Sequence, residues 1–231
     1  MRLLTVFNRL FEWYGPQHWW PGDTPFEIIV GAVLTQNTAW SNVEKAIASL
    51  KQHQALDPQR IVATDAATLG LWIRSAGYFN VKAVRLHHVC RWYLAQHEDD
   101  LARMDTAALR SALLAVNGIG PETADDIVLY AYQRPVFVID AYTRRIFSRL
   151  GHPPAADGYE ALRHYFEDTL TRQMTVTVCT GQRRRPSAPR LTRLFNEYHA
   201  LIVRHGKDVC KTRPRCSACC LRRDCPSQTV Q

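Results

Sequence analysis

The sequence predicts an all-α protein built from many short helices. Apolar residues recur at intervals of three and four along most of the chain, which places them on one face of a helix. The usual β-hairpin signal, an Asn-Gly or Asp-Gly pair between alternating apolar runs, does not occur, since Asn117-Gly118 lies between two helical patterns. The run from Val136 to Ile139 is the only strand-like one.

Composition and charge favour a nucleic-acid partner. The 231 residues are 46% hydrophobic, enough for one large domain or two small ones. Lys and Arg number 29 against 21 acids, so the net charge is +8, which favours a polyanion. No apolar run approaches the roughly 20 residues that span a bilayer, and no signal pattern opens the chain. We therefore expect no membrane partner, and we expect the protein to lie in a reducing cytosol.

The first third of the chain predicts three helices. An apolar stripe runs over 2–14 and ends at Gly15-Pro16, and a proline-rich loop with two tryptophans follows. Residues 26–34 are apolar on almost every face, which favours a buried helix, although a β-strand is the competing interpretation. A further amphipathic helix begins near Trp40, after the polar Thr35–Thr38 interruption.

The middle third predicts a short helix over 68–75, a longer one over 80–96 and a third that ends near Ala115. Gly77 is suited to the C-terminal cap of the first, and Asp105-Thr106 to the N-terminal cap of the last. We then expect helices after Asp140, over 159–170 and over 194–202. Residues 171–193 show no helical stripe, and their RRRPSAPR portion indicates an exposed basic loop. A solvated loop is the favoured interpretation, and disorder or contact with DNA are the alternatives.

A glycine hairpin separates two of these helices. Gly118 and Gly120 supply a turn that β-carbons would obstruct, and Pro121 restarts a helix at the position where proline is best tolerated. Glu122 places negative charge in its first turn, where the helix dipole favours it. Exposed amides ahead of a helix can hold a phosphate, but an ordinary helix–turn–helix corner is the favoured interpretation of a lone Gly-x-Gly.

Cysteines crowd the C-terminal end. Cys210, Cys216, Cys219 and Cys225 are separated by five, two and five residues, so four thiolates can converge on one centre, while Cys220 is spare. In a reducing compartment such crowding indicates metal rather than disulfides. Zinc and a [4Fe–4S] cluster both accept four thiolates, and the spacing does not choose between them.

Together these features resemble endonuclease III and its relatives, the helix-hairpin-helix DNA glycosylases. The matching stretches are VNGIGPETA with the run ending at Asp140, LTQNT at 34–38 and the four-cysteine loop. The resemblance implies a six-helix barrel domain with the hairpin over 25–132, and a helical domain from 1–24 and 133–231. Double-stranded DNA containing a damaged base would lie in the cleft between them, bound by a monomer in the prokaryotic cytosol.

The resemblance also implies a [4Fe–4S] cluster held by the four cysteines in a loop over 205–226, whose first spacing is one residue shorter than the family's. This cluster would be structural and would dock a basic loop on DNA. The loop's charges are Lys207, Lys211, Arg213, Arg215, Arg222 and Arg223.

Two carboxylates carry the functional prediction. The family's catalytic aspartate falls on Asp140, where a fixed anion would stabilise positive charge on the deoxyribose and orient the incoming water. Asp140 also precedes a helix, whose amides would keep it ionised, and a bare N-cap is the alternative role. Bifunctional members carry a Schiff-base lysine where this chain has Glu122, so we predict a monofunctional glycosylase.

Within the family, the motifs are most similar to those of 3-methyladenine DNA glycosylase III, although some members of that branch lack the four cysteines. The resemblance implies that Trp20, Pro21 and Trp40 form a slot for an electron-poor alkylated purine, although both tryptophans also suit a core. Gln36 would enter the gap left by the flipped nucleotide, with Asn117, Gly118 and Gly120 on the DNA backbone. The alternatives are a glycosylase for oxidised or mismatched pyrimidines and a non-catalytic damage-binding protein.

Overall fold

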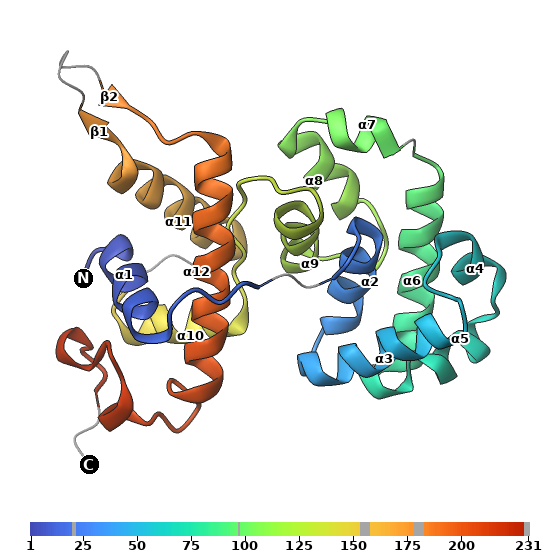
Figure 1. The fold of residues 1–231 in the computed structure, drawn as a ribbon, viewed down its shortest axis with the longest axis horizontal. Coiled ribbons are helices and arrows are strands. Elements are labelled where there is room, and N and C mark those ends of the chain that lie inside the picture. The colour runs from blue at the N-terminus through green and yellow to red at the C-terminus, as the bar shows by residue number, and fades with distance from the viewer. Residues whose placement is uncertain (20–21, 97, 153–157, 178–182, 229–231) are drawn as a thin grey trace. The chain divides into compact units, whose positions relative to one another are not determined.

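The computed structural model describes residues 1–19, 22–96, 98–152, 158–177 and 183–228. Helices dominate these ranges, as the sequence predicts (Figure 1). Contacts group the chain into two compact units, Trp20–Gln133 and Met1–Trp19 with Arg134–Gln231. Each unit is described by itself below.

The unit over residues 20–133 is built around α2 (Pro25–Thr35), which contacts α3 (Trp40–Gln52), α6 (Phe79–Leu94) and α9 (Pro121–Asp126). This apolar segment is a helix and not the competing strand, and every residue from Phe26 to Leu34 is buried. Thr24 caps it by accepting a hydrogen bond from the Glu27 amide at 3.1 Å, and Pro25 occupies the first turn.

The predicted helix over 68–75 is divided in the structure. It consists of α5 (Ala66–Trp72) and a 3₁₀ turn, η1 (Arg74–Ala76), with Ile73 between them. Gly77 follows η1 with a φ of 68°, which confirms its predicted capping position. Two short helices that the sequence analysis did not predict, α4 (Pro58–Ala63) and α7 (Glu98–Arg103), are too short to show a helical period.

The helices on either side of the hairpin are α8 (Thr106–Leu114) and α9. Asp105 caps α8 by accepting from the Ala108 amide at 2.9 Å, as predicted. After α9 the helix widens into a π-helical segment, η2 (Ile127–Ala131), whose five residues are all buried.

In the other unit, α1 (Leu3–Tyr14) and α10 (Ala141–Arg149) both pack on α12 (Ala188–Asp208), the long helix that Figure 1 shows in orange. α11 (Tyr159–Met174) packs on α1. The core holds an aromatic cluster in which Phe137 stacks on Phe166, with ring centroids 4.6 Å apart. Tyr198 is fully buried in it and donates to the Leu3 carbonyl at 2.7 Å.

One prediction for this unit is wrong, and one run that looks like a strand in the sequence does not form one. The stretch 171–193 is not a loop throughout, because α11 continues to Met174, α12 begins at Ala188, and β1 (Val176–Thr177) pairs antiparallel with β2 (Arg183–Arg184). The run Val136–Ile139 is not a strand, although all four residues are buried. Apolar character there reflects burial, whereas a strand of two residues is too short to show a period.

The cysteine region follows α12 and contains two 3₁₀ turns, η3 (Cys216–Ala218) and η4 (Arg222–Asp224). Across the described ranges, no helix is both long and apolar enough to cross a membrane.

Candidate active site and nucleic-acid interface

The hairpin turn requires glycine at Gly118. Its φ of 93° lies in the region that L side chains rarely adopt, and a β-carbon there would collide with the Arg85 side chain of α6. The neighbouring residue Asn117 is exposed, and its carbonyl lies 3.1 Å from Nδ1 of His88. One face of α6 therefore supports the turn through two side chains.

The turn does not require glycine at Gly120. It is the N-cap of α9 with a φ of −91°, and a β-carbon on it would meet nothing within 4 Å. The prediction that a β-carbon would obstruct the turn is thus correct for Gly118 and wrong for Gly120. Open space ahead of a helix N-terminus leaves the backbone there accessible to an anion.

Gln36 belongs to the same cluster. Its Nε2 donates to the Gly118 carbonyl at 3.1 Å and to Oγ1 of Thr123 at 2.9 Å. Its Oε1 accepts from Nη1 of Arg85. The residue that follows α2 is therefore bonded to both sides of the hairpin, so the structure brings Gln36, Gly118 and Asn117 together.

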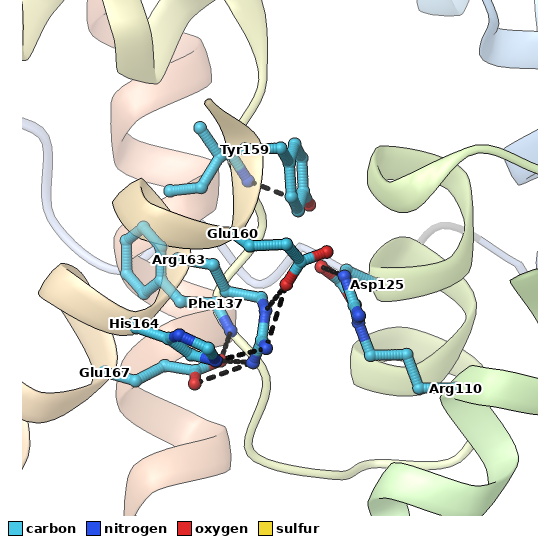
Figure 2. A network of polar contacts seen from close by, with 9 residues as sticks. Arg110, Asp125, Phe137, Tyr159, Glu160, Arg163, His164 and Glu167 are labelled. Atoms are coloured by element: carbon cyan, nitrogen blue, oxygen red, sulfur yellow. Dashed lines mark hydrogen bonds and ion pairs between the residues drawn. The ribbon is translucent and has the colours of Figure 1, made fainter. Parts of the chain in front are cut away.

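A buried ion pair joins the two hairpin helices (Figure 2). Nε of Arg110, on α8, lies 2.6 Å from Oδ1 of Asp125 on α9, and Nη2 lies 3.3 Å from Oδ2. The Asp125 side chain is fully buried, so the bidentate pairing compensates for the loss of its hydration. This pair fixes the two helices on either side of the turn.

Glu122 lies in the first turn of α9 and is exposed. The position that resembles that of the Schiff-base lysine thus presents a carboxylate at the surface of the hairpin. Lys82, the buried lysine of this unit, is 1% exposed, and its Nζ donates to the carbonyls of Leu34 and Ala76 at 2.9 and 2.7 Å.

Trp40 begins α3, and its ring lies over Gly31 of α2. It is neither fully buried nor fully exposed, and it lines a hollow of about 430 Å³. Carboxylates contribute much of the remaining lining, namely Asp23, Glu27 and Glu44, and Lys51 pairs with the first two at 2.9 Å. Trp20 and Pro21, the other predicted slot residues, lie outside the described residues.

Asp140 is the N-cap of α10 in the other unit and is 8% exposed. Its Oδ1 accepts two hydrogen bonds from Thr143, from the amide at 2.6 Å and from the hydroxyl at 2.7 Å. Its Oδ2 lies 3.6 Å from Nε2 of His199 on α12. Burial alone would raise the pKa of Asp140, but His199 and the Thr143 donors together hold it below its ordinary value.

Side chains of α11 hold the segment that leads to Asp140 (Figure 2). The Phe137 amide donates to Glu167 at 2.9 Å, and the Ile139 amide donates to the Tyr159 hydroxyl at 3.3 Å. Arg163 binds both oxygens of Glu167, at 3.0 and 2.8 Å. Because these bonds satisfy buried amides that form no sheet ladder, they position the backbone immediately before Asp140.

The four predicted cysteine ligands line one small cavity at the end of α12. Two arginines of α10 contact this cysteine loop. Nη1 of Arg149 lies 3.2 Å from Sγ of Cys210, and Arg145 donates to the carbonyls of Cys210 and Gly206 at 2.8 and 2.9 Å. The two arginines therefore tie the first cysteine and the end of α12 to α10.

All four cysteines surround one cavity, and those in the described residues are free of disulfides. No set of three His, Cys, Asp or Glu residues in the described ranges is arranged to hold one metal ion. Four thiolates around one cavity suit either zinc or a [4Fe–4S] cluster.

Two residues that contact predicted site residues were missed from the sequence. His199 on α12 faces Asp140, and Arg149 on α10 lies beside Cys210. Each pair is about 60 residues apart along the chain, so no local motif predicts the contact.

Comparisons with known proteins agree with this architecture. Residues 30–172 match the family model described as HhH-GPD superfamily base excision DNA repair protein. A Methanocaldococcus jannaschii protein named as a DNA repair glycosylase is 39% identical over 96% of this chain and 95% of its own length. Endonuclease III of Sulfolobus acidocaldarius is 30% identical over 87% of this chain and 81% of its own length.

Two solved structures are also similar. The H. pylori 3-methyladenine DNA glycosylase bound to 1,N6-ethenoadenine has a TM-score of 0.74 and 28% identity, covering 90% of this chain and 98% of that one. An endonuclease III–DNA complex has a TM-score of 0.76 with 21% identity, covering 97% and 94%, and shows the shared fold. The chain belongs to the HhH-GPD superfamily of base excision DNA repair proteins and is a DNA glycosylase of that family.

Proposed function

We propose that this protein is a monofunctional DNA glycosylase that hydrolyses the N-glycosidic bond of an alkylated purine in double-stranded DNA, acting as a monomer. Asp140 would serve as the fixed anion. As the bond breaks, its electrons leave with the base and positive charge develops on the deoxyribose, which a nearby carboxylate stabilises. Water then supplies the hydroxyl, and Asp140 orients it and accepts its proton.

The observation that carries the monofunctional assignment is Glu122, exposed in the first turn of α9. A carboxylate cannot form the imine through which bifunctional relatives break the strand. Lys82 is the amine to compare with the Schiff-base lysine of bifunctional relatives. Burial, with a contribution from Arg85, lowers the pKa of Lys82 to about 8. It is 1% exposed and bonded to two carbonyls, so this amine is unavailable to a sugar.

The substrate class rests on the hollow beside Trp40. N-alkylated purines such as 3-methyladenine carry positive charge, and an aromatic face attracts a cation. Asp23 and Glu27 share the ammonium of Lys51, and Glu44 adds a further carboxylate, so an excess of negative charge around this hollow adds the same electrostatic preference. The similarity to the H. pylori 3-methyladenine glycosylase supports this class.

A second candidate is a glycosylase for oxidised or mismatched pyrimidines, favoured by the 30% identity to an endonuclease III. A non-catalytic damage-binding protein is disfavoured by Asp140, because a carboxylate that is 8% exposed yet held ionised is costly unless the charge has a use.

We also propose that Cys210, Cys216, Cys219 and Cys225 hold a [4Fe–4S] cluster, with zinc as the alternative. When bound, such a cluster would tie the loop together by four bonds rather than take part in hydrolysis. The basic residues of the loop would then be held in place for contact with DNA phosphates.

The test is incubation with a panel of duplexes that carry 7-methylguanine, ethenoadenine, thymine glycol or a G:T mismatch, followed by alkali to reveal abasic sites. We expect cleavage after alkali for the alkylated purines and none without alkali. The matched variants are Asp140→Asn, which should abolish excision, and Glu122→Gln, which should retain it.

Borohydride added during the reaction tests the strand chemistry separately. A covalent enzyme–DNA adduct would contradict the monofunctional assignment. Excision of only the oxidised or mismatched pyrimidines would favour the second candidate, and binding without any excision would favour the non-catalytic one.

A further inference from the structure

The two oxygens of Asp140 have different environments. Oδ1 accepts from both the amide and the hydroxyl of Thr143, so its lone pairs are occupied within its own helix. Oδ2 accepts neither of these Thr143 hydrogen bonds and instead faces Nε2 of His199 at 3.6 Å. The reacting oxygen of the proposed mechanism is therefore Oδ2, and the side chain beside it is His199.

We propose that His199 is a positioning residue for Asp140, whose Nε2–H group holds Oδ2 toward the reacting sugar. This inference rests on the proposed catalytic role of Asp140. No proton is transferred to or from His199 in this role. The imidazole keeps the carboxylate ionised and fixes its rotation, while Asp140 itself contacts the water.

Burial makes such a partner necessary. The side chains of His199 and Asp140 are 9% and 11% exposed, and a carboxylate removed from water is costly without donors on both oxygens. Thr143 supplies donors to one oxygen only. His199 is the group that faces the other.

The position of His199 is fixed by its helix. The preceding residue, Tyr198, is fully buried and bonded to the Leu3 carbonyl, so this turn of α12 cannot rotate freely. α10 and α12 pack along each other, which brings Thr143 and His199 to the same carboxylate. α12 thus supplies the side chain that faces Oδ2 of Asp140, although His199 lies 59 residues away in the sequence.

Other ionisable groups near this point have separate partners in the described structure. From α11, the Tyr159 hydroxyl accepts from the Ile139 amide, and the Arg144 guanidinium on α10 lies over the Tyr159 ring. Farther along α12, His205 lies 2.9 Å from the Tyr14 hydroxyl of α1 and 3.5 Å from Sγ of Cys219. Of the two side chains that lower the pKa of Asp140, Thr143 and His199, only His199 is ionisable.

The first experiment replaces His199 with phenylalanine, which keeps a ring but removes the donor, and with glutamine, which retains one. Carbon-13 NMR titration, with Asp140→Asn assigning the resonance, measures the Asp140 pKa. We expect His199→Phe to raise that pKa by about one pH unit or more, because burial is then less compensated, and His199→Gln to raise it less. His87→Phe is the control, since His87 is also buried but bonds to the Thr64 carbonyl.

The same variants are measured in single-turnover excision and in binding to abasic duplex. We expect His199→Phe to slow excision by about tenfold or more while the Kd changes by less than about threefold, and His199→Gln to recover part of the rate. A merely structural role would not shift the Asp140 pKa. An unchanged Asp140 pKa in folded His199→Phe overturns the proposal.

A second measurement needs no change at His199. Nitrogen-15 NMR follows the His199 imidazole in the wild type and in Asp140→Asn, and loss of the neighbouring anion should lower its pKa. An identical His199 titration in both proteins contradicts the pairing even if His199→Phe fails to fold. If the wild type excises no lesion, the proposed function fails, while both NMR results still decide whether the pair exists.

Discussion

Gln36 and Gly118 are joined by a 3.1 Å hydrogen bond from the side-chain amide to the hairpin carbonyl, although they lie 82 residues apart. With Thr123 and Arg85 as its other partners, Gln36 uses its amide on the hairpin rather than on solvent. The residue that resembles the family's gap-filling glutamine is thus bonded into the hairpin turn.

Gln36→Ala should reduce both stability and recognition of damage. We expect the free energy of unfolding to fall by about 1–2 kcal/mol from the lost hydrogen bonds. The affinity for lesion-bearing duplex, measured by fluorescence anisotropy, should fall by about tenfold, because no side chain remains to fill the gap. Thr123→Val is the control, since it removes one hairpin bond and leaves the glutamine. Equal losses of affinity in the two variants would contradict the gap-filling role.

The two hairpin glycines should respond differently to alanine. Gly118→Ala places a β-carbon against Arg85 at a positive φ and should cost about 1–3 kcal/mol of unfolding free energy, measured by urea denaturation. Gly120→Ala meets open space and should leave stability unchanged within about 0.5 kcal/mol. If the amides of this turn hold a phosphate, Gly120→Ala should still weaken DNA binding. Normal binding by a stable Gly120→Ala would place the DNA backbone elsewhere.

The cysteines provide a matched pair for the metal prediction. Cys216→Ser removes a proposed ligand and should abolish the broad visible absorbance of an iron–sulfur cluster, with iron and sulfide lost together. Cys220→Ser changes the spare neighbour and should retain full iron content. Zinc in place of iron in the purified wild type, with no visible band, would support the alternative centre. Loss of metal in both variants would contradict the assignment of the spare thiol.

Lys82 should make the free energy of unfolding depend on pH in the alkaline range. Its pKa is lowered from an ordinary 10.5 to about 8 in the folded state, so the unfolded chain binds more protons between these values. Its contribution to the free energy of unfolding therefore rises with pH from about 8 to about 10.5. Urea denaturation across this range, compared with Lys82→Met, isolates the contribution from that of other groups. A wild-type profile parallel to that of Lys82→Met would show that the amine is not desolvated.

The helical class and the hairpin could be predicted because their signals are local. The buried segment Phe26–Leu34 and the turn at Gly118 each carry enough information in a few residues, through apolar continuity and through a backbone conformation that favours glycine. The short helix α4 and the pair of two-residue strands fall below the length at which a period can be detected.

By itself, the sequence determined the helical hairpin and the cysteine spacing, since each is encoded in a short stretch of residues, and the resemblance of its motifs to a family made Asp140 a candidate. Only the tertiary structure decided what surrounds them. The packing of α10 on α12 brings His199 to Asp140 and Arg149 to Cys210, and the packing of α6 brings Arg85 to Gly118. Spacing along the chain cannot reveal such pairs, because they depend on which helix faces meet when apolar surface is buried.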